Sequence, residues 1–259
     1  MIVHPLANLT TPYDVLANRY CAVTKSHGTC GLGIGKTMER QINSGHKIYA
    51  IDLLNLDLLV EKISQLSMYY PEINSLEHEN YFKKYFEAII KLDWDIQDYT
   101  YLKNKDLIFE GSQGVLLDMD HGVYPHVTFT NTTSKNAVEI CKKLGHKNIH
   151  VYGATRTYHS RHGNGLFPTK PLPLINNEEE TCKYNEYQGE FKIGDLDYDL
   201  LNQAIEFDKI YSNQLNRQFT LVVTCVDQLD VFNINKVKDN NTFRTLYFNS
   251  PINNSPKII

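Results

Sequence analysis

Three stretches of the chain carry apolar side chains at the three- to four-residue spacing of an amphipathic helix: residues 12–27, 81–96 and 198–215. In the second stretch, Phe82, Phe86, Ile89 and Ile96 share one face. A one-sided apolar face packs against the rest of a protein, so we predict a helix in each stretch and a largely helical region over residues 45–100.

Short runs of apolar or β-branched residues alternate with these helices and end in polar residues or glycine: residues 106–111, 148–158, 218–227 and 245–250. Runs of this length and composition are typical of buried strands. The alternation predicts an α/β protein with a largely parallel central sheet flanked by helices. Residues 175–197 are polar and lack periodicity, so we expect an exposed loop there.

The loops that follow the predicted strands are the first places to look for a site, because ligands of parallel α/β sheets bind beyond the carboxyl ends of the strands. Four loops meet this condition: residues 110–114, 161–165, 224–227 and 249–251.

The bulk composition limits the class of protein. The 259 residues, 42% of them hydrophobic, suffice for one large core or two modest ones, and we treat residues 1–259 as a single domain. A net charge of -4 argues against duplex nucleic acid as a partner. No apolar run is long enough to span a membrane, and the N-terminal residues lack the pattern of a signal peptide.

The cysteines indicate the compartment. There are five, an odd number, and they are scattered without a Cys-x-x-Cys pair: Cys21, Cys30, Cys141, Cys182 and Cys225. This pattern fits reduced thiols rather than a disulfide framework or a zinc site. We therefore expect a cytoplasmic globular protein.

The stretch "HGTCGLGIGKTMER" (residues 27–40) places four glycines before a Lys-Thr pair, as a phosphate-binding P-loop does. Gly35, Lys36 and Thr37 supply the end of that pattern, but Cys30 stands where its first glycine is required and Gly31 is one residue out of register. The preceding residues also have helical spacing rather than that of a buried strand. As a triphosphate-binding P-loop this is a near miss, and we favour two other interpretations, a flexible connection and a backbone cradle for another anion.

Residues 109–137 hold most of the remaining candidate chemistry. They are expected to form a strand end, a loop dense in hydrogen-bonding groups, and a new helix capped by residues 131–133. Gln113 offers the amide donor and acceptor needed to recognise a purine edge. Asp118, Asp120 and His121 are conceivable metal ligands, but acid-rich turns more often hold themselves together through Asx-type hydrogen bonds, so we expect no metal there.

These motifs resemble those of the adenylosuccinate synthetase family. "EGSQG", "DHGVYP" and "NTT" within residues 110–133 match its Glu-Gly-Ala-Gln-Gly, Asp-His-Gly-Thr-Tyr-Pro and Asn-Thr-Thr. "GTCGLGIGK" matches the family's Gly-Thr-Thr-Gly-Arg-Gly-Ile-Gly-Pro. "YHSRHGNGLFPT" (158–169) matches its Tyr-Ser-Thr-Arg-Val-Gly-Ala-Gly-Pro-Phe-Pro-Thr. "TCVDQLD" (224–230) matches its Thr-Lys-Leu-Asp-Val-Leu-Asp. "NSP" (249–251) falls at the family's Ser-Thr-Gly-Pro loop. The order is the same along almost the whole chain, which implies the family's α/β fold, a relative of the P-loop NTPases.

The resemblance also implies residue roles. Thr29, Cys30, Gly31 and Thr128 would hold the 5′-phosphate of a purine monophosphate, and Gln113 would contact its 6-oxygen.

Three more groups follow from the same correspondence. Arg161 and Gly163 would line the substrate pocket, and Gly189 and Lys192 would lie in the loop that admits L-aspartate. The nucleoside triphosphate, ATP or GTP, would bind at four residues: Cys225, Asp227, Ser250 and Pro251. The Mg²⁺ that the family uses would be held mostly by residues of the family's N-terminal part, which this sequence lacks.

The sequence departs from the family at its start. The family begins with a Gly-Asp-Glu-Gly-Lys-Gly-Lys loop that carries the catalytic Asp, the magnesium site and the triphosphate cradle, and a catalytic His follows. This sequence starts after both, so we expect an N-terminally truncated form that is inactive alone, because little would then stabilise charge in phosphoryl transfer. The alternatives are a non-catalytic nucleotide-binding half that works with an N-terminal partner chain, and a gene fragment without activity.

Further departures concern specificity and assembly. The aspartate loop is shortened and keeps Lys192 as its only cation, and Cys225 replaces the lysine next to Asp227, which leaves ATP as a donor. The arginine that the family borrows from its dimer mate falls at Ser44, with Arg40 one turn away as a stand-in for a homodimer contact.

The short aspartate loop looks more like the viral branch, 2-aminoadenylosuccinate synthetase, which couples dGMP to aspartate using ATP. We therefore hypothesise a ligase that joins L-aspartate to C6 of a 6-oxopurine monophosphate, with dGMP preferred and IMP as the alternative. Its location would be the host cytoplasm if the gene is viral.

Overall fold

The computed structural model describes residues 2–167, 169–173, 184, 186–226, 232–238, 243–247 and 257–258. The chain divides into two compact units. Unit 1 comprises Met1–Lys105 with Glu186–Gln188, and unit 2 comprises Asp106–Asn185 with Gly189–Ile259. Each unit contains its own cluster of buried apolar side chains. The single domain expected over residues 1–259 stays a prediction.

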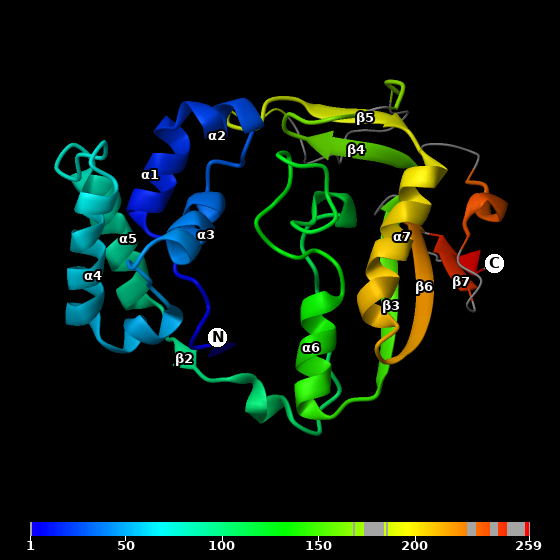
Figure 1. Cartoon of the computed structure of the whole chain (residues 1–259), viewed down its shortest axis with the longest axis horizontal. Helices are drawn as coiled ribbons and strands as arrows, with labels where there is room; N and C mark the ends of the chain where they lie inside the picture. The colour runs from blue at the N-terminus through cyan, green and yellow to red at the C-terminus, as the bar shows by residue number, and fades with distance from the viewer. Residues whose placement is uncertain are drawn as a thin grey trace. The chain divides into compact units, whose positions relative to one another are not determined.

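Unit 1 is largely helical (Figure 1). Its elements are β1 (Ile2–Val3), α1 (Pro12–Tyr20), α2 (Ala22–His27), α3 (Ile34–Asn43), the 3-10 helix η1 (Ala50–Leu54), α4 (Leu56–Tyr69), α5 (Glu79–Lys91), β2 (Asp95–Ile96) and the 3-10 helix η2 (Tyr99–Leu102). Strands β1 and β2 pair in parallel. The helices predicted within residues 12–27 and 81–96 are both present.

Helix α1 begins at a capping box. The Thr11 hydroxyl accepts a hydrogen bond from the Asp14 backbone N–H, and the Asp14 carboxylate accepts one from the Thr11 N–H. Pro12 occupies the first helical position, where its missing N–H has no cost. The helix then buries apolar side chains in the core of unit 1, which includes Tyr13, Leu16, Ile48, Leu59, Ile63, Leu66 and Tyr70.

Helix α5 ends earlier than the apolar spacing predicts. It ends at Lys91, and Ile96 lies in β2 instead of on the helix face. Trp94 and Ile96 still pack against the unit 1 core. The predicted extent was wrong because a short strand delivers the same apolar side chains to the core that another helical turn would.

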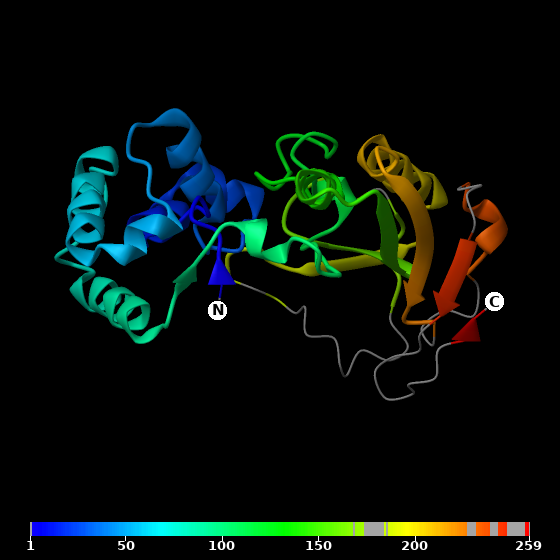
Figure 2. The same ribbon diagram turned by 90° about the horizontal axis from the view of Figure 1, so that it is seen from below.

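Unit 2 is built on a four-stranded sheet with the order β3 (Asn148–Arg156), β6 (Asn216–Thr224), β7 (Phe243–Tyr247) and β8 (Lys257–Ile258). The first three strands are parallel and β8 is antiparallel to β7. Helix α7 (Tyr198–Ser212) lies along the sheet (Figure 2) and contacts α6 (Lys135–Leu144). The predicted α/β architecture with a largely parallel sheet is confirmed.

The core of unit 2 lies between α7 and the sheet. Leu201 and Ile205 of α7 pack against Phe219, Leu221 and Val223, which alternate along β6 and are almost fully buried. Because side chains two apart on a strand share a face, this alternation places one face of β6 against α7. The two predicted segments, 198–215 and 218–227, therefore pack against each other.

Three predictions in unit 2 were wrong. Residues 106–111 form no strand: Ile108 is 100% exposed, and within the described ranges no strand lies beside the segment to receive its backbone hydrogen bonds. Residues Phe191–Asp195 of the expected loop form β5, which pairs antiparallel with β4 (Tyr158–His162). The cap of α6 is Ser134 rather than residues 131–133.

The remaining described elements of unit 2 are two short 3-10 helices, η3 (Val115–Leu117) and η4 (Ile234–Lys236). In the part of the chain that is described, no helix has the length and hydropathy needed to cross a membrane.

Candidate functional site

The glycine-rich loop joins α2 to α3 in unit 1. Gly28, Gly31 and Gly33 all have positive φ angles, from 66° to 80°. Residues other than glycine rarely adopt this backbone conformation. Thr29 exchanges hydrogen bonds with the Asn18 side chain at 3.1 and 3.2 Å. Helix α3 starts at Gly33 without a capping side chain, so an anion can take the place of the missing cap.

Two of these glycines are also required by packing. A Cβ at Gly33 would lie 2.7 Å from the backbone nitrogen of Val15 in α1. A Cβ at Gly31 would lie 2.6 Å from the ring of Tyr187. The glycines therefore let α1 and the Tyr187 ring approach the loop closely, whatever the loop binds.

The Lys-Thr pair of the loop is used inside unit 1. Lys36 Nζ forms an ion pair with Glu39 at 2.9 Å, within α3. The Thr37 hydroxyl donates to the Gly33 carbonyl at 3.0 Å and lies 2.9 Å from the Thr10 hydroxyl. Both side chains therefore have partners within unit 1.

Arg40 is not available to a dimer mate. Its side chain is fully buried, and its donors bind the Asp14 carboxylate and the carbonyls of Leu9 and His46. Asp14 also accepts a hydrogen bond from the Tyr70 hydroxyl. The prediction of Arg40 as a stand-in for the missing arginine was wrong, because the guanidinium holds α1, α3 and the preceding loop together.

In unit 2, the loop of residues 113–134 is organised around Asp118, which is fully buried. Its carboxylate accepts the backbone N–H groups of Asp120, Thr132 and Thr133. Burial alone would raise the pKa of this carboxyl, but the N–H donors outweigh it and hold the pKa of Asp118 below its usual value. The bond to the N–H two residues later is the Asx-type turn expected from the sequence.

The other two conceivable metal ligands have partners of their own. Asp120 binds Lys135 and the Asn131 amide, and His121 Nε2 lies 2.8 Å from the Tyr211 hydroxyl. No group of three or more His, Cys, Asp or Glu side chains within the described ranges is placed to hold a metal ion. Among the described residues we therefore assign none to a magnesium site.

Gln113 begins the loop that Asp118 organises, and Thr128 lies in its second half. Gln113 is exposed and has a φ of 70°, an uncommon conformation for a residue with a side chain. The Thr128 N–H donates to the Leu117 carbonyl at 2.8 Å, which ties the second half of the loop to the first.

Arg161 of β4 faces this loop. Its Nη2 donates to the His126 carbonyl at 3.1 Å, and its guanidinium packs over Gly165, where a Cβ would clash. Its Nε is buried and finds no acceptor among the described residues. Burial lowers the pKa of Arg161 but leaves it a cation at neutral pH. A half-buried guanidinium with an unused donor is suited to receive an anion.

Arg161 and Lys192 are directly opposite each other in the β4–β5 ladder. Opposed residues of an antiparallel pair lie on the same face of the sheet. Lys192 Nζ donates to the Gly163 carbonyl at 3.4 Å, and His162 Nε2 bonds to the Gly189 carbonyl at 3.0 Å. The pairing of β4 with β5 therefore brings together the four residues that the sequence assigns to the substrate pocket and the aspartate loop: Arg161, Gly163, Gly189 and Lys192.

Neither cation of this pair forms an ion pair with a carboxylate in the described part of the chain. Like charges directly opposite each other on two strands destabilise a sheet. An anion bound between the two side chains would remove that cost. We call Arg161 and Lys192 the cation pair.

The triphosphate-site residues are described only in part. Cys225 follows β6 with a φ of 57°, and its carbonyl accepts a hydrogen bond from the Thr157 hydroxyl at 2.8 Å. Its Sγ lies 3.9 Å from the Tyr158 hydroxyl, which Arg156 also approaches to 2.9 Å. Asp227, Ser250 and Pro251 lie outside the described residues.

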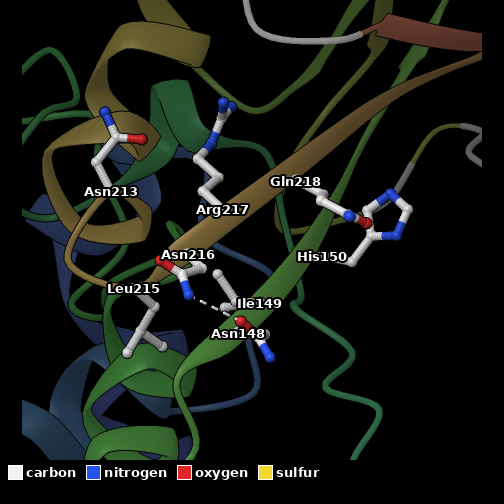
Figure 3. A pocket seen from close by; sticks show the side chains of 8 residues that line it. All are labelled: Asn148, Ile149, His150, Asn213, Leu215, Asn216, Arg217 and Gln218. Carbon is white, nitrogen blue, oxygen red and sulfur yellow. Dashed lines mark hydrogen bonds between the residues drawn. The ribbon is translucent and has the colours of Figure 1, made fainter.

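A separate cavity of about 680 Å³ lies at the amino ends of β3 and β6, lined by Asn148, Ile149, His150, Asn213, Leu215, Asn216, Arg217 and Gln218 (Figure 3). Figure 3 shows Arg217 and Gln218 on opposite sides of the strands, so the polar groups do not converge. This end of a parallel sheet is opposite to the one where ligands bind, and no sequence-predicted site residue lines the cavity.

Sequence reasoning missed two residues that hold the glycine-rich loop in place, the buried Asp14 and the half-buried Tyr187. Asp14 is signalled by the spacing Thr11-x-x-Asp14, which matches a capping box. Tyr187 has no sequence signal, because its partner Gly31 is more than 150 positions earlier in the chain.

Comparison with known proteins identifies the family. A model of the adenylosuccinate synthetase family matches residues 1–242. The adenylosuccinate synthetase of Coxiella burnetii (strain RSA 331 / Henzerling II) is 33% identical over 253 residues, which covers 87% of this chain and 54% of that protein. The enzyme of Buchnera aphidicola subsp. Baizongia pistaciae is 30% identical over 227 residues, covering 78% of this chain and 52% of that protein.

Solved structures share the fold. Adenylosuccinate synthetase from Plasmodium falciparum aligns with a TM-score of 0.53 and 24% identity, over 78% of this chain and 48% of that one. Succinoaminodeoxyadenylate synthetase of cyanophage S-2L, bound to dGMP and dATP as an energy donor, aligns with a TM-score of 0.55 and 12% identity, over 89% and 59%.

The chain spans about half the length of the curated relatives it matches. The family match nevertheless extends from the first residue through the glycine-rich loop, the Asp118 loop and the cation pair. By this match and by its fold, the chain belongs to the adenylosuccinate synthetase family.

Proposed function

We propose that this chain supplies the purine-monophosphate and aspartate sites of a ligase that joins L-aspartate to C6 of a 6-oxopurine monophosphate. The family membership supports the reaction class. The cation pair is the observation that carries the proposal, because two cations with no described carboxylate partner on one face of the β4–β5 pair suit an amino acid that carries two carboxylates.

The residues that would bind the purine monophosphate are assigned from the family's motifs. Thr29, Cys30, Gly31 and Thr128 would bind its phosphate through backbone and hydroxyl donors, and Gln113 would hold the 6-oxygen as negative charge develops there. Aspartate would enter beside Gly163, Gly189 and Lys192, and its amine would then form the new C–N bond. These assignments follow the family's motifs and the hydrogen bonds described above.

We favour dGMP as the monophosphate. The shortened aspartate loop supports this choice, and the cyanophage protein that shares the fold binds dGMP. IMP is the alternative, since the curated relatives are adenylosuccinate synthetases.

The family uses Mg²⁺ and GTP. We assign none of the described residues to the metal. Cys225 stands where the family has a lysine next to Asp227, so the preference for ATP or GTP is open to test. Assays with each triphosphate compare the two donors.

A second candidate is a non-catalytic half that binds nucleotide and works with an N-terminal partner chain. The exposed segment of residues 106–111 favours it, because a strand-like sequence with a fully exposed Ile108 is suited to pair with a further strand. A homodimer stays a prediction.

The test uses the chain as it is. Calorimetry with dGMP and IMP should give a weak dissociation constant, from high-micromolar to millimolar, or about −4 to −6 kcal/mol. A chromatographic assay with aspartate, Mg²⁺ and ATP or GTP should give no succinylated product.

The matched variants are Arg161→Met and Lys147→Met, the latter at an exposed lysine that precedes β3 at the amino end of the sheet. We expect Arg161→Met to lose aspartate binding at least tenfold and Lys147→Met to retain it. Folded wild-type chain that binds neither monophosphate would refute the proposal, and succinylated product from pure chain would show that the half-length chain is a complete enzyme.

A further inference from the structure

The ring of Tyr187 covers the middle of the glycine-rich loop. Gly31 is buried beneath it with a φ of 73°, and a Cβ at that position would lie 2.6 Å from two ring atoms. Any residue larger than glycine would have to displace the ring. The loop and the ring are therefore fitted to each other.

Arg19 holds the same glycine from the side of α1. Its Nε donates to the Gly31 carbonyl at 3.0 Å. Its guanidinium carbon lies 5.1 Å from the centre of the Tyr187 ring and 5.9 Å from that of Tyr81. A guanidinium within about 6 Å of an aromatic face is attracted to it, so Arg19 links α1, the loop and Tyr187.

The place of Tyr187 in the chain gives this contact its meaning. The segment Glu186–Gln188 belongs to unit 1, with the glycine-rich loop, although the residues on both sides of it belong to unit 2. Gly189 follows with a φ of 76°, and Lys192 of the cation pair comes three residues later. The contact between Tyr187 and Gly31 therefore lies within unit 1.

We propose that Arg19 and Tyr187 form a latch that holds the glycine-rich loop in its binding conformation. Both are positioning residues, since they act on the site through Gly31. The inference rests on the proposed function for its ligands. A loop ordered in advance binds more tightly, because ordering a mobile loop subtracts from affinity.

The latch itself can be tested without any ligand. Hydrogen exchange of the peptide covering residues 28–33, and alkylation of the half-buried Cys30 followed by mass spectrometry, report on the order of the loop. Tyr187→Ala should speed both at least fivefold, whereas Tyr187→Phe keeps the ring and should match the wild type. Tyr184→Ala is the matched control, because Tyr184 is 72% exposed and lies three residues away.

Arg19→Lys serves as a second variant in case Tyr187→Ala does not fold. It keeps the charge but loses the guanidinium plane and the Nε donor. It should therefore also speed hydrogen exchange of residues 28–33 and alkylation of Cys30. Equal rates in wild type and in a folded Tyr187→Ala, or an equal effect of Tyr184→Ala, would overturn the latch.

A binding experiment then separates the latch from the proposed function. Calorimetry should show a loss of dGMP affinity of at least fivefold in Tyr187→Ala and none in Tyr187→Phe. If wild-type chain binds no purine monophosphate, the proposed function fails while the exchange rates still decide whether the latch exists. Unchanged dGMP affinity in a variant with a loosened loop would refute the role in binding.

Discussion

Asp14 and Arg40 form an ion pair 2.9 Å long in which both side chains are completely buried. The Asp14 carboxylate also accepts hydrogen bonds from the Thr11 N–H and hydroxyl and from the Tyr70 hydroxyl. Burying a charge is costly unless it is paired and its remaining hydrogen-bonding capacity is used. The pair meets both conditions, and it fixes α3 and the glycine-rich loop that precedes it against α1.

Removing one partner of this pair should destabilise unit 1. We expect Arg40→Met to lose about 3–5 kcal/mol, because Asp14 would be left as an unpaired buried charge. Glu39→Gln is the control, since it breaks a partly exposed pair on the same helix worth about 0.3–0.5 kcal/mol. Urea unfolding followed by the fluorescence of Trp94, the single tryptophan and a part of this core, measures the loss. Equal midpoints for the two variants would contradict the role given to Arg40.

Asp118 should make the stability of unit 2 depend on pH. Its pKa is lower in the folded state than in the unfolded one, so it contributes stability that is present above about pH 4 and is lost as the pH falls through the folded value. Asp118→Asn should therefore lower the stability at pH 6 and flatten its decline in acid. Thermal unfolding by circular dichroism between pH 3 and 6 measures this.

Asp106→Asn is the control for Asp118, because Asp106 is exposed. It should leave the pH profile unchanged. An acid decline in Asp118→Asn as steep as in the wild type would mean that other groups cause it.

Cys141 should be the slowest of the described cysteines to react. Its side chain is buried, and burial raises the pKa of its thiol, so little reactive thiolate is present at neutral pH. Cys21, Cys30 and Cys225 are only half-buried. Iodoacetamide followed by mass spectrometry should label these three first, and all should react at similar rates in urea. Early labelling of Cys141 in the folded chain would contradict the burial of its side chain.

The exposed segment of residues 106–111 should promote self-association. Ile108 is 100% and Phe109 40% exposed, and an unpaired strand-like sequence is a site for pairing with another chain. Ile108→Asp should reduce concentration-dependent association in sedimentation velocity without loss of folding stability. Leu76→Asp, at an 82% exposed leucine of unit 1, is the matched control. Association that persists equally in both variants would place the contact elsewhere.

The sequence correctly predicted those elements whose apolar side chains pack against another element of the same chain. The spacing of residues 198–215 and the run of 218–227 specify α7 and β6, because Leu201 and Ile205 meet Phe219 and Leu221 directly. The run of residues 106–111 has the same strand-like composition but meets no strand among the described residues. Composition indicates which secondary structure a segment favours. A strand also needs a neighbouring strand that pairs with its backbone N–H and C=O groups.

The sequence by itself determined the family and predicted the candidate residues of the site, since the motifs are short and contiguous. Only the tertiary structure decided which of them meet. The opposition of Arg161 and Lys192 depends on the register of β4 and β5, and the burial of Gly31 depends on Tyr187, far along the chain. Such relationships are fixed by strand pairing and close packing between distant segments, and no local pattern of hydrophobic and polar residues records them.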